Sequence, residues 1–155
     1  MKRSVRLVLG WLSLVGGALG LAGGVFALFA TSRLDPSSAF FLAFMLGFFV
    51  LGAYAGYAAL REAGPWQALL VMFWVAQLPL VSLPVFSYFS SAGLGARLFA
   101  TTEPRLGADY YIGSQVGFTA GSPGPAGEHF AFGINVVAAL AAFVAAQGMR
   151  RRRAV

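Results

Sequence analysis

The chain has 155 residues, of which 59% are hydrophobic and only 10% are charged, and its mean hydropathy is +0.77. A water-soluble domain of this composition could not cover its own surface with polar groups, so the sequence predicts a membrane protein. The net charge of +6 does not indicate nucleic-acid binding, because most of the basic residues flank the ends of the chain and do not form a face.

The sequence contains no cysteine and a single histidine, His129. The chain therefore lacks the residues for disulfides, Cys-based metal centres, lipid attachment through cysteine or a haem held by two of its own histidines. We accordingly expect neither a cofactor nor a metal.

The first apolar stretch, residues 5–30, begins beside Lys2, Arg3 and Arg6 and exceeds the roughly 20 residues that cross about 30 Å of hydrocarbon. We expect the first transmembrane helix here. Ala18 and Gly20 have the small-residue spacing that signal peptidase accepts, so a cleaved signal peptide is the alternative interpretation. The apolar run continues well beyond these two residues, which favours the helix.

Two further spans are expected before the chain becomes polar. A turn containing Pro36 leads to a span over residues 39–60, and a short cytoplasmic turn leads to a third span over residues 66–90. Pro79 and Pro84 would interrupt the hydrogen-bond ladder of the third helix, so we expect it to be kinked.

Residues 91–127 are too polar and too rich in glycine and proline to enter lipid, and we expect them to form an extracytoplasmic loop. Within this loop, residues 96–101 and 109–119 are rich in side chains that favour extended structure, which predicts a short β-hairpin. A fourth span is expected over residues 130–149.

Basic residues are concentrated on one side of these spans, at the N-terminus, at Arg61 and in the C-terminal run of arginines. By the positive-inside rule, both termini are cytoplasmic and the loop at 91–127 is periplasmic or extracellular. The predicted fold is an all-α integral membrane protein of the bacterial inner membrane or a plasma membrane. Its single domain, residues 1–155, would be a four-transmembrane-helix bundle.

Small residues recur every four positions in three of the expected spans, a spacing that lets helices approach closely in lipid. The repeats consist of Gly16, Gly20, Gly24, Gly52, Gly56, Ala138, Ala142 and Ala146. They could form a dimerisation face, but packing among the chain's own helices is favoured because several spans carry such a repeat.

A few polar or helix-breaking residues could line a ligand groove that opens outward from the third span. The candidates are Gln77, Pro79, Pro84, Tyr88, Asn135 and His129. The simpler interpretation is a kinked helix whose Gln77 bonds a neighbour, and Gln77 could pair with Asn135 if the third and fourth helices are adjacent.

No ionisable residue lies in the centre of any expected span, which counts against a proton-coupled transporter or an ion pump. The leading hypothesis is a non-enzymatic membrane protein, either an accessory subunit or a homo-oligomer, whose partners are the bilayer and another membrane protein or itself. One alternative is binding or transport of an apolar or lipid-like molecule. A second is a membrane-interface enzyme that uses His129 as a general base.

Overall fold

The structure is a computed structural model that describes residues 1–30, 36–83, 86–91, 94–101, 106–112, 115–120 and 131–153. Helices and strands alternate in blocks along this part of the chain. In order, the elements are α1 (Arg3–Ala30), α2 (Pro36–Arg61), α3 (Trp66–Ala76), β1 (Pro79–Leu83), β2 (Phe86–Ser91), β3 (Leu94–Thr101), β4 (Leu106–Ile112), β5 (Gln115–Ala120), β6 (Ala131–Asn135) and α4 (Val136–Arg153).

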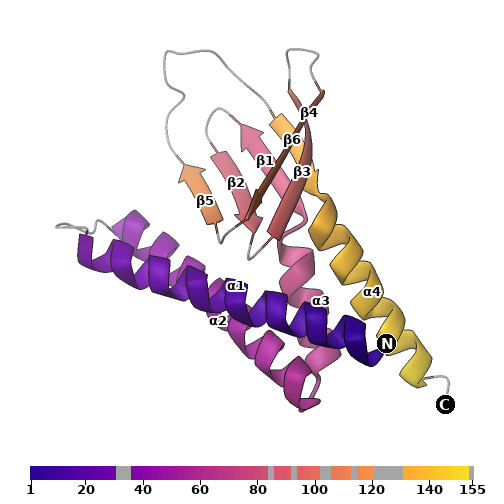
Figure 1. The fold of residues 1–155 in the computed structure, drawn as a ribbon. Coiled ribbons are helices and arrows are strands. Elements are labelled where there is room, and N and C mark those ends of the chain that lie inside the picture. The colour runs from indigo at the N-terminus through magenta and orange to yellow at the C-terminus, as the bar shows by residue number, and fades with distance from the viewer. Residues whose placement is uncertain are drawn as a thin grey trace.

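Helices α1 and α2 pack along each other as an antiparallel pair (Figure 1). Their backbones meet where glycines remove the side chain: a Cβ on Gly17 would lie 2.4 Å from the backbone nitrogen of Ala53, and one on Gly56 would lie 2.4 Å from that of Leu14. Small residues thus set the distance between the two helices.

A cluster of aromatic side chains joins α2 to α3 and lies in the buried core. The rings of Phe48 and Phe73 are 5.2 Å apart, and those of Phe73 and Trp74 are 5.5 Å apart. Gly52 makes room for Phe73, whose ring lies 2.5 Å from where a Cβ on Gly52 would be. Helix α4 covers the other side of α3 with a buried face that includes Ala138 and Ala145.

The six strands form one antiparallel sheet in the order β4-β3-β6-β1-β2-β5. The last strand in the chain, β6, lies in the middle of the sheet between β3 and β1. Figure 1 shows the sheet at the ends of α3 and α4 that lie away from the two chain termini.

The expected third span is not a continuous helix. Helix α3 ends at Ala76, and β1 begins two residues later at Pro79. Proline has no N–H and clashes with a preceding helical turn, whereas the first position of a strand tolerates it. Pro79 therefore ends the helical conformation completely, where the sequence analysis expected a kink.

The expected fourth span is divided in the same way, because its first residues form β6 and its remainder forms α4. In β6, Phe132 and Ile134 alternate with Gly133 and Asn135, which is the period of a strand. The four-span bundle is therefore not confirmed. In the described part of the chain, two helices are long and apolar enough to cross a membrane, at Arg3–Phe26 and Ala39–Arg61, whereas the apolar segments Trp66–Ala76 and Val136–Met149 are shorter.

The β-hairpin expected in the outer loop is confirmed in part, because β3 pairs with β4 and Arg97 lies opposite Asp109. Its second strand, expected over residues 109–119, is instead divided between β4 and β5, and β5 pairs with β2. The sheet is larger than expected because β1, β2 and β6 come from segments that were predicted to be helical. The fold is thus a helical unit joined to a small antiparallel sheet.

Candidate functional site

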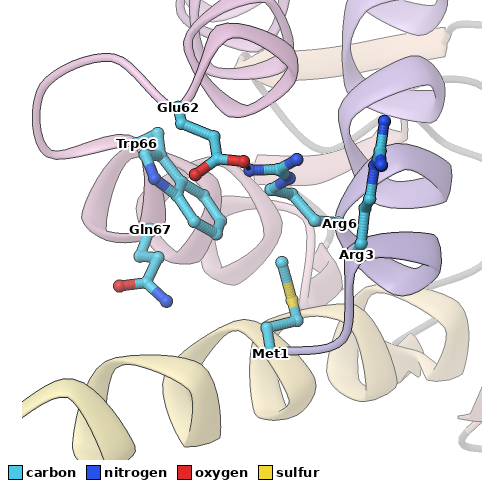
Figure 2. A pocket seen from close by; sticks show the side chains of 6 residues that line it. All are labelled: Met1, Arg3, Arg6, Glu62, Trp66 and Gln67. Carbon is cyan, nitrogen blue, oxygen red and sulfur yellow. Dashed lines mark ion pairs between the residues drawn. The ribbon is translucent and has the colours of Figure 1, made fainter.

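Charged and polar side chains from three helix ends meet near the N-terminus. Arg6 of α1 forms an ion pair with Glu62, which follows the last residue of α2, and the Arg6 guanidinium carbon lies 5.9 Å from the ring centre of Trp66 at the start of α3. Figure 2 shows the Arg6 and Glu62 side chains pointing toward each other beside Trp66. The contact fixes the start of α1 against the turn that joins α2 to α3.

The end of α4 reaches the same place. A Cβ on Gly148 would lie 2.9 Å from Nε2 of Gln67 and 3.1 Å from the Met1 Cβ. A small hollow of about 140 Å³ between α1 and α4 is lined by Met1, Lys2, Val5, Val144 and Gln147. We call this region, where the starts of α1 and α3 and the ends of α2 and α4 meet, the basic end.

The basic end contains a polar cavity of about 180 Å³. Its lining consists of Met1, Arg3, Arg6, Glu62, Trp66 and Gln67 (Figure 2). Arg6 is buried and its Nε has no hydrogen-bond partner among the described residues, while Arg3, which also lines the cavity, is exposed. Anionic groups such as lipid phosphates are the chemistry that suits such a cavity.

The lining does not form a catalytic arrangement. Glu62 is the single carboxylate among the lining residues and is paired with Arg6, and the lining offers no Ser, Thr, Cys or His that it could activate. Among the described residues there is also no group of three His, Cys, Asp or Glu residues that could hold a metal ion.

The two buried amides predicted from the sequence lie at one junction between the helices and the sheet. Gln77 follows the last residue of α3, is fully buried and donates a hydrogen bond from Nε2 to the Phe73 carbonyl at 3.3 Å. Asn135 precedes α4, is 2% exposed and accepts a hydrogen bond at Oδ1 from the Ala138 backbone N–H at 3.2 Å.

The junction is held by the backbone as well, because the Asn135 N–H donates to the carbonyl of Leu78 at 3.0 Å. Both amides therefore contribute to the places where a helix ends or begins. Asn135 Nδ2 is buried without a hydrogen-bond partner in the described part of the chain.

The other groove candidates are not brought together in the described structure. Pro79 is exposed at the start of β1, and Tyr88 lies in β2, where its side chain is outside what the structure describes. Pro84 and His129 lie outside the described residues. A ligand groove at these residues therefore remains a prediction.

The small-residue repeats make contacts within the chain. A Cβ on Gly20 would lie 2.2 Å from the Phe49 ring, and one on Gly24 would lie 2.8 Å from the Leu46 side chain. Gly16, Ala138 and Ala142 are buried, and Ala146 is half-buried. By contrast, a Cβ on Gly23 or Gly47 would meet nothing within 4 Å.

The contacts of the basic end were not found by sequence reasoning. Arg6 and Glu62 are far apart in the sequence, and the only signal available was that both were expected near the cytoplasmic ends of spans. Comparisons with protein-family models, with curated proteins and with solved structures find no match to this chain.

Proposed function

We propose that the chain is a non-enzymatic integral membrane protein that works as a subunit of a larger assembly, with another membrane protein or with further copies of itself. The observation that carries the proposal is the open sheet. Within the described residues, β4 pairs only with β3 and β5 pairs only with β2, so each has one side with unpaired backbone groups.

Membrane insertion of α1 and α2 is supported by the faces that these helices leave uncovered. Their most apolar windows are only 39% and 33% buried, although a core helix of a soluble protein is mostly buried. The uncovered side chains are large and apolar, among them Trp11, Leu19 and Phe26 in α1 and Phe40 in α2. Lipid suits such a surface better than water does.

The glycine repeats do not require a partner protein, because most of these glycines already pack closely against a neighbouring helix of the same chain. The sheet edges differ, since rows of free N–H and C=O groups are templates for an added strand. Open sheet edges are also not tolerated in the hydrocarbon region. Extended segments of the assembly that pair with β4 and with β5 would meet both requirements.

The proposed orientation places the basic end in the cytoplasm and the sheet on the outer side. Lys2, Arg3, Arg61 and the arginines at the end of α4 then lie next to anionic headgroups of the inner leaflet. The bacterial inner membrane or a plasma membrane is the corresponding location.

The test is native mass spectrometry of the protein extracted from its own membrane in lipid nanodiscs, together with hydrogen exchange of the same sample. We expect a reproducible stoichiometric assembly, in which the edge-strand amides of β4 or β5 exchange more slowly than in the dissociated chain. A lone chain would contradict the proposal. If that chain retained a lipid or another apolar molecule, the result would favour a ligand-binding protein.

A further inference from the structure

One face of the sheet is exposed and apolar across its three central strands. Leu98 is 50% exposed, Phe132 56% and Ile134 44%. Ile134 lies opposite both Leu98 and Pro79 in the register, and Phe132 lies opposite Ala100 and Val81. This apolar sheet face comprises Leu98 and Ala100 of β3, Phe132 and Ile134 of β6, and Pro79 and Val81 of β1.

Such a face is unusual for a sheet in water. An antiparallel sheet with one face in solvent normally carries polar residues on that face and apolar residues on the covered one. Here the exposed face is apolar: Ile134 is 44% exposed, whereas Asn135, its neighbour in the chain, is buried on the opposite face. Burial of large apolar side chains is favourable, so something apolar is expected to cover Leu98, Phe132 and Ile134.

The lengths of α3 and α4 indicate how deep the sheet would lie in the bilayer. Both helices start or end at the basic end, which marks the cytoplasmic boundary in the proposed orientation. At a rise of about 1.5 Å per residue, the 11 residues of α3 extend about 16 Å and the apolar part of α4, Val136–Met149, about 21 Å. The hydrocarbon is about 30 Å thick, so the sheet begins roughly 10 Å short of its outer boundary.

We propose that the apolar sheet face lies in the outer leaflet and contacts lipid acyl chains directly. The inference rests on the membrane insertion stated under the proposed function. It extends the lipid-contacting surface from α1 and α2 to the apolar sheet face. The occupant is the bilayer itself, and a protein covering is an outcome that the experiment below distinguishes.

The distribution of charge permits this depth. No charged residue occurs between Glu62 and Arg97, a segment that includes all of β1 and β2, and none occurs in residues 130–149. Arg97 belongs to the opposite face, where it is half-buried and lies opposite Asn135 in the register. A charged side chain at membrane depth is expected to face the protein interior in this way.

The backbone also permits it for the strands that carry the face. β1, β3 and β6 each have a neighbouring strand on both sides, and the register pairs them on both sides over Val81–Ser82, Arg97–Ala100 and Ala131–Ile134, so most of the backbone groups of the apolar sheet face have partners within the sheet. Only the outermost strands, β4 and β5, have an open side among the described residues, and the proposed function gives that side to a partner.

The inference is tested by spin labelling of single-cysteine variants in nanodiscs, which is direct because the chain has no cysteine of its own. The sheet sites are Phe132→Cys and, on the neighbouring strand, Leu98→Cys. Collision with oxygen, which concentrates in hydrocarbon, is compared with collision with a water-soluble nickel chelate. Leu19→Cys on α1 serves as the control for membrane insertion, and Lys2→Cys serves as the aqueous control.

We expect the oxygen-to-nickel ratio at both sheet sites to approach that of Leu19→Cys and to exceed that of Lys2→Cys several-fold. A sheet that nickel reaches freely while Leu19→Cys remains in lipid would overturn the inference and leave the membrane proposal intact. Poor access of both reagents to the sheet would overturn it in favour of a protein covering. Free access of nickel to Leu19→Cys would overturn both proposals.

Discussion

At Gly17 the backbones of α1 and α2 leave no room for a methyl group. A Cβ there would lie 2.4 Å from the Ala53 nitrogen and 2.7 Å from the Phe49 carbonyl oxygen. Backbone atoms cannot rotate away as the end of a side chain can, so the helices themselves would have to separate. Gly23, six residues further along the same helix, has open space around it.

Gly17→Ala should therefore destabilise the helix pair, and Gly23→Ala should not. Both changes gain the same helix propensity of about 1 kcal/mol, so the difference between them isolates the steric effect. We expect Gly17→Ala to lower the free energy of unfolding by about 1–3 kcal/mol relative to Gly23→Ala. Thermal unfolding in detergent, followed by tryptophan fluorescence, measures this difference, and equal stability of the two variants would contradict the observed packing.

The side-chain amide of Asn135 is only half satisfied, because its oxygen accepts a hydrogen bond and its nitrogen has no partner among the described residues. Oδ1 caps the first turn of α4, which typically contributes about 1 kcal/mol, while Nδ2 is buried without a partner among the described residues. An unsatisfied buried donor costs a comparable amount. The net contribution of this side chain to stability is therefore small, despite its complete burial.

Between elements, the Arg6–Glu62 ion pair links the start of α1 to the end of α2. Glu62 adopts φ of 56°, a left-handed conformation that glycine usually occupies at this position after a helix, and the Ala63 N–H donates to the Ala58 carbonyl at 2.9 Å. A non-glycine residue is strained there by about 1 kcal/mol or more. The ion pair offsets this strain and fixes the turn.

The two partners of this pair should respond unequally to mutation. Glu62→Gln leaves the buried Arg6 charge without a counter-charge, whereas Arg6→Met leaves a carboxylate that is 54% exposed and can be hydrated. We expect Glu62→Gln to cost between about 1 and 3 kcal/mol and Arg6→Met to cost less. Adding Arg6→Met to Glu62→Gln should recover part of the loss in thermal unfolding, and simple additivity of the two changes would contradict this account.

For the molecule as a whole, the basic end and the sheet lie at opposite ends of α3 and α4 (Figure 1). If the proposed orientation is correct, the two ends face different compartments. A cysteine placed at Lys2 and one placed at Ser122, in the loop expected outside the membrane, should then differ in their access to a membrane-impermeant maleimide.

In intact cells we expect the maleimide to label Ser122→Cys and to label Lys2→Cys only after the membrane is disrupted. The reason is the positive charge near Lys2, which resists transfer across the membrane. Labelling of both sites in intact cells would contradict the proposed orientation, and so would labelling of Lys2→Cys alone.

The two long helices were predictable because each consists of an apolar run long enough to override any local preference, as in Arg3–Phe26 and Ala39–Arg61. The strands β1 and β6 were not predictable in this way, because high hydropathy is compatible with a buried strand as well as with a transmembrane helix. The deciding signals were local: Pro79 at the start of a strand, and the alternation around Gly133. These two local signals mark the points at which the structure divides the two expected spans.

The candidate site was predictable to a lesser extent. The sequence indicated that Gln77 and Asn135 could be neighbours, and the structure brings them to one junction because Leu78 and Asn135 share a backbone hydrogen bond. The cavity at the basic end depends on contacts such as Gln67 with Gly148, whose sequence separation leaves no local pattern to read. For this cavity, the sequence indicated only the charges of Arg6 and Glu62 and the positions of the turns near them.

The central position of β6 has a consequence for the order of folding. This strand joins β4 and β3 on one side to β1, β2 and β5 on the other, and it is synthesised after all of them. Until it is made, the sheet can exist only as two separate pieces, whereas α1 and α2 are neighbours in the chain and can pair early. A released chain that ended before residue 131 would thus contain a finished helical hairpin beside two unjoined groups of strands, whose exposed inner edges would make them prone to aggregation.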